Sequence, residues 1–306
     1  MTLPDHVRIV EVGPRDGLQS EAATLPAHVR ATLIDRLAGA GLVHIEAASF
    51  VSPEAIPQMA GAAEVLALCA HHSQLCLSVL VPNMMGLDAA LKAGAREVAV
   101  FASASETFSQ QNIRCSINKS IERYAEVVNA ALRKGVPARG YVSCALGCPY
   151  EGEIDRDRVR SVSRALSDIG CRQIALADTI GVGTPLSARR IVQHVARDVP
   201  LERLAVHFHD TYGQALANIF ACLEIGVATV DSSVAGLGGC PNAPGASGNV
   251  ATEDVVYMLK GMGIDTGVDL ERVLGAGNFI CRALRRAPSS RVARAFAATL
   301  SGETGA

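Results

Sequence analysis

Residues 173–210 read QIALADTIGVGTPLSARRIVQHVARDVPLERLAVHFHD and contain one complete repeat of the pattern that decides the fold. A short apolar segment, QIALAD from Gln173, predicts a buried strand, and Ser187–Arg197 has the apolar spacing of a helix. A second strand-like segment, LAVHFHD, begins at Leu204. Strand, helix and strand in this order indicate two parallel strands joined by a crossover helix.

The same unit recurs along the chain, with strand starts about 30 residues apart. The eight expected strands are VRIVEVG from Val7, VHIEAAS from Val43, LCLSVLV from Leu75, EVAVFAS from Glu97, VPARGYVSCAL from Val136, QIALAD from Gln173, LAVHFHD from Leu204 and ATVDSSV from Ala228. The expected helices between them are Ala27–Ala40, Met59–Cys69, Met84–Ala93, Ile117–Lys134, Asp155–Ile169, Ser187–Arg197, Gln214–Ile225 and Thr252–Met262.

Eight such units predict an α/β fold, a TIM (β/α)8 barrel over about residues 7–265, as a single domain of residues 1–306. A C-terminal helical extension is expected over about residues 269–300. A doubly wound open sheet is the alternative, but no GxGxxG motif follows the first strand.

The composition excludes several classes of protein. Of the 306 residues, 49% are hydrophobic, and 28 Lys and Arg face 30 Asp and Glu. A disordered chain or a basic nucleic-acid surface is therefore not expected. No apolar run predicts a membrane span, the first ten residues hold no basic apolar leader, and the nine cysteines are scattered. We expect a cytoplasmic protein with no nucleic-acid or membrane partner.

Polar residues at the ends of the eight expected strands are the candidate site residues, because a TIM barrel carries its function at the carboxyl ends of its strands. They are Arg15, Asp16, Glu46, Asn83, Ser103, Glu106, Tyr141, Ser143, Asp178, Thr179, His207, His209, Asp210 and Asp231.

His207 and His209 are the sharpest feature at these ends. Side chains alternate along a strand, so the two imidazoles share one face while Phe208 points the other way. In a closed barrel the first strand lies near the last two, so Asp16 supplies a carboxylate at the same place. The three residues predict a metal site, although two hydrogen-bonded histidines at a strand end would give the same pattern.

Arg15 precedes Asp16 in EVGPRDGLQ, where Pro14 and Gly17 indicate a tight turn after the first strand. We expect the two side chains to point in different directions, so that one binds a metal and the other faces a substrate anion. A salt bridge that caps the barrel is the alternative interpretation.

The loop GLGGCPNAPGASGN, residues 236–249, follows the eighth expected strand. Its Gly and Pro content predicts a flexible or highly turned loop over the barrel mouth, where the thiol of Cys240 is accessible. A buried thiol is the alternative. Asn249 ends the loop and is either a metal ligand or a helix cap. Cys144 and Cys148 have zinc-like spacing, but no second pair completes a four-ligand site.

The candidate ligands are two imidazole nitrogens, one carboxylate and one amide oxygen. This mixed set favours Mg²⁺ or Mn²⁺, with room for water and substrate. Two histidines and one carboxylate also suit Fe(II), so an oxygenase stays open. A non-catalytic scaffold is the competing class, but it would need no convergence of these groups.

Six segments of the chain resemble the hydroxymethylglutaryl-CoA lyase family. They are EVGPRDGLQSE, SFVSPE, GYVSCALGCPYEG, LADTIGVGTP, AVHFHDTYGQALAN and VDSSVAGLGGCPNAPGASGNVATEDVVYML, and the resemblance runs from about Arg8 to Arg286. Condensing relatives, such as isopropylmalate and homocitrate synthases, share the Arg-Asp and His-x-His motifs. The cysteine-bearing GLGGCP loop is much more specific to the lyases.

The resemblance implies a role for each candidate residue and predicts a homodimer. The implied metal ligands are Asp16, His207, His209 and Asn249. Arg15 is implied to bind the substrate and stabilise its enolate, and Cys240 is the implied catalytic residue of the loop. Further residues that match polar positions lining the family's site are Glu46, Tyr141 and Asp178.

The implied reaction is a retro-Claisen cleavage of the CoA thioester 3-hydroxy-3-methylglutaryl-CoA to acetoacetate and acetyl-CoA, in leucine degradation. One alternative is the same cleavage of a longer, isohexenyl-type homologue. The other is a related acyl-CoA condensation. A base must take the hydroxyl proton of the substrate, and Asp16, His207 and Cys240 are all candidates.

The chain departs from the family's pattern at several positions, none of which is a candidate ligand. They are Ala47, Ala48, Val81, Met85 and Asn242. These departures concern substrate detail, and they leave the predicted reaction class unchanged.

We predict that Cys240 reacts with an alkylating agent faster than the other cysteines, because access and thiolate fraction govern the rate. A bound substrate analogue should protect it. Cys240→Ser should keep metal and substrate binding but lose most of kcat, since a serine hydroxyl is a far weaker acid than a thiol. Peptide mapping after partial alkylation and kinetics of the variant measure both effects. Full activity of Cys240→Ser would move the proton-transfer role to His207 or Asp16.

Overall fold

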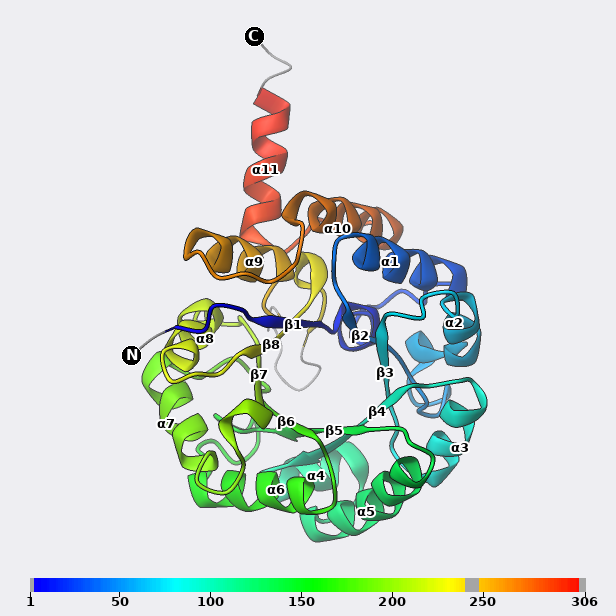
Figure 1. Ribbon diagram of the computed structural model, residues 1–306, viewed down its shortest axis with the longest axis vertical. Helices are drawn as coiled ribbons and strands as arrows, with labels where there is room; N and C mark the ends of the chain where they lie inside the picture. Colours follow the sequence, from blue (N-terminus) through cyan, green and yellow to red (C-terminus); the bar gives the residue numbers. More distant parts are fainter. Residues whose placement is uncertain (1–2, 240–247, 303–306) are drawn as a thin grey trace.

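The structure is a computed structural model that describes residues 3–239 and 248–302. In it, eight parallel strands close into a barrel in sequence order, and β1 pairs with β8 (Figure 1). The strands are β1 (Arg8–Glu11), β2 (His44–Ser49), β3 (Cys76–Leu80), β4 (Glu97–Ser103), β5 (Ala138–Ser143), β6 (Gln173–Asp178), β7 (Leu204–Phe208) and β8 (Thr229–Ser232). Each observed strand falls within an expected one, and the predicted TIM barrel is confirmed.

Helices surround the barrel (Figure 1). They are α1 (Ala27–Gly39), α2 (Ala62–Leu68), α3 (Met84–Lys92), α4 (Glu106–Ile113), α5 (Ile117–Arg133), α6 (Arg156–Asp168), α7 (Pro185–Val195), α8 (Ala215–Leu223), α9 (Thr252–Gly261), α10 (Leu270–Leu284) and α11 (Arg291–Gly302). Short turns are the π-helical η1 (Gly13–Gly17) and the 3₁₀ turns η2 (Pro57–Met59), η3 (Leu201–Arg203) and η4 (Val234–Gly236).

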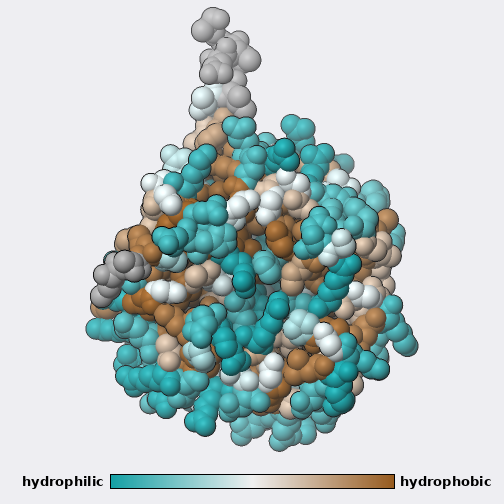
Figure 2. Space-filling model, in the orientation of Figure 1, coloured by the Kyte–Doolittle hydropathy of each residue, from teal (hydrophilic) through white to brown (hydrophobic). Residues whose placement is uncertain are grey.

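The predicted C-terminal extension is confirmed as α10 and α11. α10 packs against α1 on the outside of the barrel. α11 projects beyond the rest of the surface (Figure 2). No helix in the described residues is both long and apolar enough to span a membrane.

α4 is a helix that the sequence does not predict, because ETFSQQNI lacks a helical apolar period. The available signal is its N-cap, since the side chain of Ser105 accepts a hydrogen bond from the backbone N–H of Phe108. Glu106 was expected at the end of the fourth strand, and this expectation is wrong. It lies in the first turn of α4 instead.

Alternation along the strands separates two layers of side chains. Val206 and Phe208 of β7 belong to the core between the strands and the helices, whereas Ala205 lies in a separate interior cluster. By the same alternation, His207 points to the inside of the barrel and His209 follows on that face. The predicted shared face of the two histidines is therefore confirmed.

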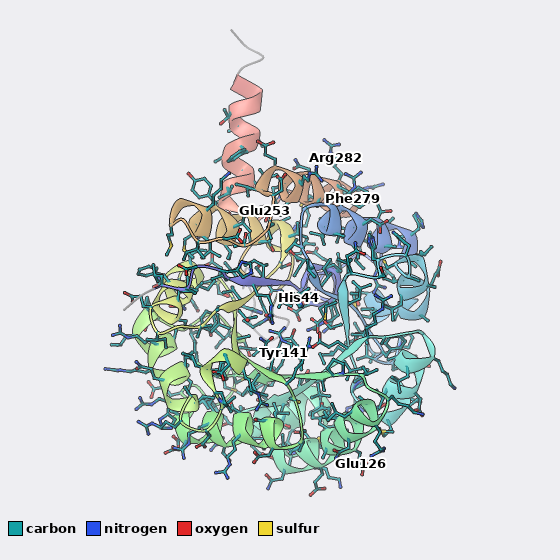
Figure 3. All side chains as sticks on the ribbon, viewed as in Figure 1. His44, Glu126, Tyr141, Glu253, Phe279 and Arg282 are labelled. Atoms are coloured by element: carbon teal, nitrogen blue, oxygen red, sulfur yellow. The ribbon has the colours of Figure 1, made fainter. Side chains whose placement is uncertain are left out.

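The interior of the barrel combines small apolar side chains with large polar ones. Ala99, Ala175 and Ala205 leave volume beside Tyr141, which lies inside the ring of strands (Figure 3). Arg139, two residues earlier on β5, is also buried there. Branched apolar residues fill most such barrels, so this interior is unusual in holding charged groups.

We predict that Gly41→Ala destabilises the protein more than Gly94→Ala. Gly41 has a φ of +93° and Gly94 a φ of +80°, a region that costs other residues about 1–3 kcal/mol. Only at Gly41 would a Cβ also meet backbone, 2.1 Å from the carbonyl oxygen of Gly267, whereas at Gly94 nothing lies within 4 Å. Urea denaturation measures both free energies of unfolding. Equal losses would contradict the clash.

Candidate active site

Three of the predicted ligands meet at the carboxyl end of the barrel. Asp16 lies in η1, directly after β1, while His207 is in β7 and His209 follows it. One donor atom of each residue lies within 4.8 Å of the other two, and His207 Nε2 is 3.9 Å from Asp16 Oδ2. Closure of the barrel produces this convergence, as the sequence predicts.

The electrostatic surroundings suit these residues to metal binding. Burial, together with the charge of His207, lowers the pKa of His209 to about 4, so its imidazole is neutral at neutral pH. Its Nδ1 is buried with no hydrogen-bond partner in the described part of the chain. Burial opposes ionisation of Asp16, but the charges of Arg15 and the histidines outweigh it and lower its pKa. Burial would lower the pKa of His207, but its hydrogen bond to Asp231 and the charge of Asp16 outweigh it and raise that pKa. The Asp16 carboxylate and the His209 imidazole are therefore already in the form that a divalent cation uses, whereas His207 must release a proton to bind it.

Asn249 lies beside this group. Its backbone forms an antiparallel bridge with His209, and its Nδ2 donates to Asp16 Oδ2 over 2.8 Å. α9 begins at Thr252 with Ala251 as its N-cap, so the alternative in which Asn249 caps that helix is wrong. The side-chain amide of Asn249 therefore lies beside Asp16 with its nitrogen toward the carboxylate, and its oxygen would have to turn toward an ion held there.

Arg15 forms ion pairs with two carboxylates at once. Its Nε and Nη2 lie 2.7 and 2.6 Å from Glu46 Oε2, and its Nη1 lies 2.7 Å from Asp16 Oδ1. The expectation that Arg15 and Asp16 point apart is wrong, and the alternative salt bridge is present. Burial would lower the pKa of Arg15, but Glu46 and Asp16 outweigh it and raise that pKa.

Glu46 reaches the interior of the barrel next to an irregularity in β2. The pairing with β3 shifts between Glu46 and Ala48, as in a β-bulge, which re-aims neighbouring side chains. Glu46 is completely buried, while Ala47 and Ala48 pack in the outer core. Val81 packs in the same core, so these three departures from the family pattern lie away from the barrel interior.

Arg139 is a residue of this site that sequence reasoning misses. Its guanidinium donates to both carboxylate oxygens of Asp231, at 2.6 and 3.0 Å, and to the hydroxyl of Tyr141 at 2.9 Å. Asp231 Oδ2 in turn lies 3.2 Å from His207 Nδ1. Arg139 lies within a strand rather than at its end, and only its two-residue spacing from Tyr141 could have indicated that it points inward.

A cavity of about 380 Å³ opens over these residues. Arg15, Asp16, Tyr141, His207 and His209 form its polar wall. Apolar side chains also line the cavity, including Ile56, Pro82, Phe101, Phe108 and Ile113. The arrangement accommodates a ligand with an anionic or metal-binding end and an apolar part.

Asp178, Cys144 and Cys148 have different surroundings from the predicted ligands. Asp178 does not line the cavity, and its carboxylate accepts hydrogen bonds from the backbone N–H groups of Val182 and Gly183. Burial raises the pKa of Asp178 to about 6. Cys144 and Cys148 are buried beside Phe108, and neither belongs to a potential metal-binding group in the described residues. Cys240 and Asn242 lie outside the described residues.

Two buried carboxyl groups, which sequence reasoning also misses, support the loops around the site. Glu11 accepts hydrogen bonds from Gly13 and Val234 backbone N–H groups and from the Thr252 hydroxyl. It therefore joins η1, η4 and α9. Glu253 accepts a hydrogen bond from the backbone N–H of Ala235. Burial raises the pKa of Glu11 to about 7 and that of Glu253 to about 8.

We predict that Glu253 makes a contribution to the free energy of unfolding that falls as the pH rises from about 5 to 8. The unfolded chain releases the Glu253 proton near the ordinary pKa of 4.5, whereas the folded protein keeps it to about 8. This contribution is complete below the unfolded pKa and declines by about 1.4 kcal/mol per pH unit until the folded pKa is reached.

Glu253→Gln should flatten this decline, since it removes one titrating group. Urea denaturation at a series of pH values measures the slope. Glu126→Gln is the matched control, because Glu126 lies exposed on α5 at the outer surface (Figure 3). An unchanged slope in Glu253→Gln would contradict the prediction.

Comparison with known proteins agrees with this geometry. The HMGL-like family matches residues 6–280. A relative from Gallus gallus, "Hydroxymethylglutaryl-CoA lyase, mitochondrial", is 55% identical over 95% of this chain and 98% of its own length. A Pseudomonas aeruginosa relative, "3-hydroxy-3-isohexenylglutaryl-CoA/hydroxy-methylglutaryl-CoA lyase", is 54% identical over 97% of this chain and 99% of its own.

The barrel also matches solved structures over almost its entire length. The crystal structure of hydroxymethylglutaryl-CoA lyase from Pseudomonas aeruginosa superposes with a TM-score of 0.96 at 54% identity and covers 98% of this chain and 100% of that one. With a family match over most of its length and relatives above half identity, the chain belongs to the HMGL-like family.

Proposed function

We propose that this protein is a divalent-metal-dependent carbon–carbon lyase that cleaves 3-hydroxy-3-methylglutaryl-CoA into acetoacetate and acetyl-CoA. The observation that carries the proposal is the group of half-buried Asp16 and buried His207 and His209 beside Arg15 in one cavity. The relatives' names supply the substrate class.

The proposed metal ligands are Asp16, His207, His209 and Asn249. When bound there, a divalent cation supplies a positive charge that lowers the pKa of the substrate's hydroxyl group. The mixed nitrogen and oxygen donors favour Mg²⁺ or Mn²⁺. Two histidines and one carboxylate also suit Fe(II), which makes the dependence on O₂ a useful test.

Arg15 is proposed to stabilise the transition state. Breakage of the bond between C2 and C3 leaves its electron pair on the acetyl thioester as an enolate. The guanidinium of Arg15 lines the cavity, and a charge fixed before the reaction stabilises an oxyanion that forms only as the bond breaks. Glu46 and Asp16 hold the guanidinium in place.

Two proton transfers complete the reaction. A base takes the hydroxyl proton, and the enolate carbon receives a proton to give acetyl-CoA. Asp16 is a weak candidate for the base, because its neighbours lower its pKa. His207 has no free nitrogen for this role once Nε2 binds the metal, because its Nδ1 bonds to Asp231. Cys240 remains a candidate for the base, and from its position in the GLGGCP loop it is also proposed to protonate the enolate.

A longer, branched substrate is the second candidate. The apolar lining residues Phe101, Phe108 and Ile113 could receive an isohexenyl chain, and the name of the Pseudomonas relative includes such a substrate. Comparison of kcat/KM for the two CoA esters distinguishes the candidates. A homodimer, a cytoplasmic location and a role in leucine degradation remain predictions.

The proposal predicts that purified protein with Mg²⁺ or Mn²⁺ converts the ester to equal amounts of acetoacetate and acetyl-CoA. A chelator should abolish the reaction and added Mn²⁺ should restore it, while strict exclusion of O₂ should change nothing. Product identification measures the outcome. An absolute O₂ requirement would favour an Fe(II) enzyme, and turnover only of a 2-oxo acid with acetyl-CoA would favour a synthase.

We further predict that Arg15→Gln lowers kcat about 10²–10³-fold, far more than it raises KM, since loss of one oxyanion donor typically costs this much. Steady-state kinetics measure both constants. Arg160→Gln is a control, because Arg160 forms its ion pairs with Asp157 and Asp198 on the outer helical layer. A near-normal kcat in Arg15→Gln would reduce Arg15 to a structural cation.

A further inference from the structure

A row of buried polar groups leads to His207 from the middle of the barrel. Arg139 donates two hydrogen bonds to Asp231, and Asp231 Oδ2 lies 3.2 Å from His207 Nδ1. The exposed fractions of Arg139, Asp231 and His207 are 3%, 1% and 6%. Because water has little access, these contacts decide which nitrogen of His207 carries hydrogen.

The charges in the row determine the direction of the hydrogen bond to His207. The guanidinium of Arg139 stays protonated, and its two parallel bonds keep the Asp231 carboxylate ionised. An ionised carboxylate has no proton to donate, so the hydrogen between Asp231 and His207 belongs to Nδ1 of the imidazole. A neutral imidazole carries a single N–H, which leaves a lone pair on Nε2.

Nε2 of His207 faces the proposed metal position, since it is 3.9 Å from Asp16 Oδ2 and belongs to the group completed by His209. We propose that Arg139 and Asp231 are a positioning pair that holds His207 in its Nδ1–H tautomer and aims the Nε2 lone pair at the metal. The inference rests on the proposed metal-dependent function. Neither residue is proposed to touch the metal or the substrate.

Tyr141 contacts both the guanidinium of Arg139 and the imidazole of His207. Its hydroxyl accepts a hydrogen bond from Arg139 Nη1, and the guanidinium lies 4.9 Å from the centre of its ring. The ring meets the imidazole of His207 edge-on, with centroids 5.7 Å apart and an interplanar angle of 81°. Contacts on two sides therefore limit rotation of the imidazole.

The first test is the tautomer of His207 in the metal-free wild-type protein. Two-bond ¹H–¹⁵N correlation spectra of histidine-labelled protein separate protonated from unprotonated ring nitrogens, and the His207→Ala spectrum identifies the signal. At a pH high enough for the imidazole to be neutral, we expect Nδ1 protonated and Nε2 unprotonated. A His207 ring protonated on Nε2 alone would overturn the inference without the need for any further variant.

The second test is the affinity for Mn²⁺, measured by electron paramagnetic resonance titration. Asp231→Asn should weaken it about 10–100-fold, the range found when an outer partner of a ligating histidine is removed, and should produce an Nε2–H signal. Glu97→Gln is the matched control, because Glu97 is a buried carboxylate paired with Arg172 away from the cavity, and it should leave both readouts unchanged.

Removal of the charge of Asp231 alone leaves the buried charge of Arg139 without an opposite charge beside it, which lowers the free energy of unfolding. The double variant Arg139→Gln, Asp231→Asn removes both charges together and is judged by the same two readouts. Normal Mn²⁺ affinity with an unchanged tautomer in either folded variant would overturn the positioning role.

His207→Ala separates the failure of this inference from the failure of the proposed function. If His207→Ala loses Mn²⁺ affinity while the Asp231 variants keep it, the metal site stands and the positioning pair is wrong. If His207→Ala itself binds Mn²⁺ normally, the proposed metal site is wrong.

Discussion

Pairing between β1 and β8 is the constraint on which the rest of the structure depends. Arg8 to Glu11 align with Thr229 to Ser232 in parallel, and this contact closes the sheet. It sets η1, which carries Arg15 and Asp16, beside the carboxyl ends of β7 and β8. Glu11 strengthens the junction, because its buried carboxyl group bonds to Gly13 in η1 and to Val234 in η4. Without closure of the barrel, no contact between strands would hold Asp16 near His207.

Charge compensation is the second constraint, and it follows from the first. A closed barrel excludes water from its centre, where an unpaired charge costs several kcal/mol. Arg15 is therefore balanced by Glu46 and Asp16, and Arg139 by Asp231. Each pair also fixes a geometry, since a guanidinium bonded at two or three nitrogens has little freedom. The charged interior thus gives the site a defined shape at some expense of stability.

Local patterns were enough to predict the barrel and most of its elements. Strands such as QIALAD from Gln173 have an apolar centre. The apolar residues of most helices repeat with the helical period of about 3.6 residues. The sequence did not predict α4, because this short polar segment has no such period. Only the capping role of Ser105 defines its start. Arg139 was not predicted as a residue of the site for a different reason. A charged residue within a strand does not reveal which neighbours will neutralise it after folding.

The amino-acid sequence by itself determined the repeat, the inward face shared by His207 and His209, and the candidates at the strand ends, because these depend on spacing along one chain. Only the tertiary structure decided that Arg15 bonds to Asp16 as well as Glu46, that Asn249 approaches Asp16, and that Arg139 reaches Asp231. Except for the bond between the neighbours Arg15 and Asp16, those contacts join residues far apart in sequence across a water-poor interior. Their partners are determined by distance in the folded protein and by the need to neutralise buried charge. Neither can be read from the order of neighbouring residues in the sequence.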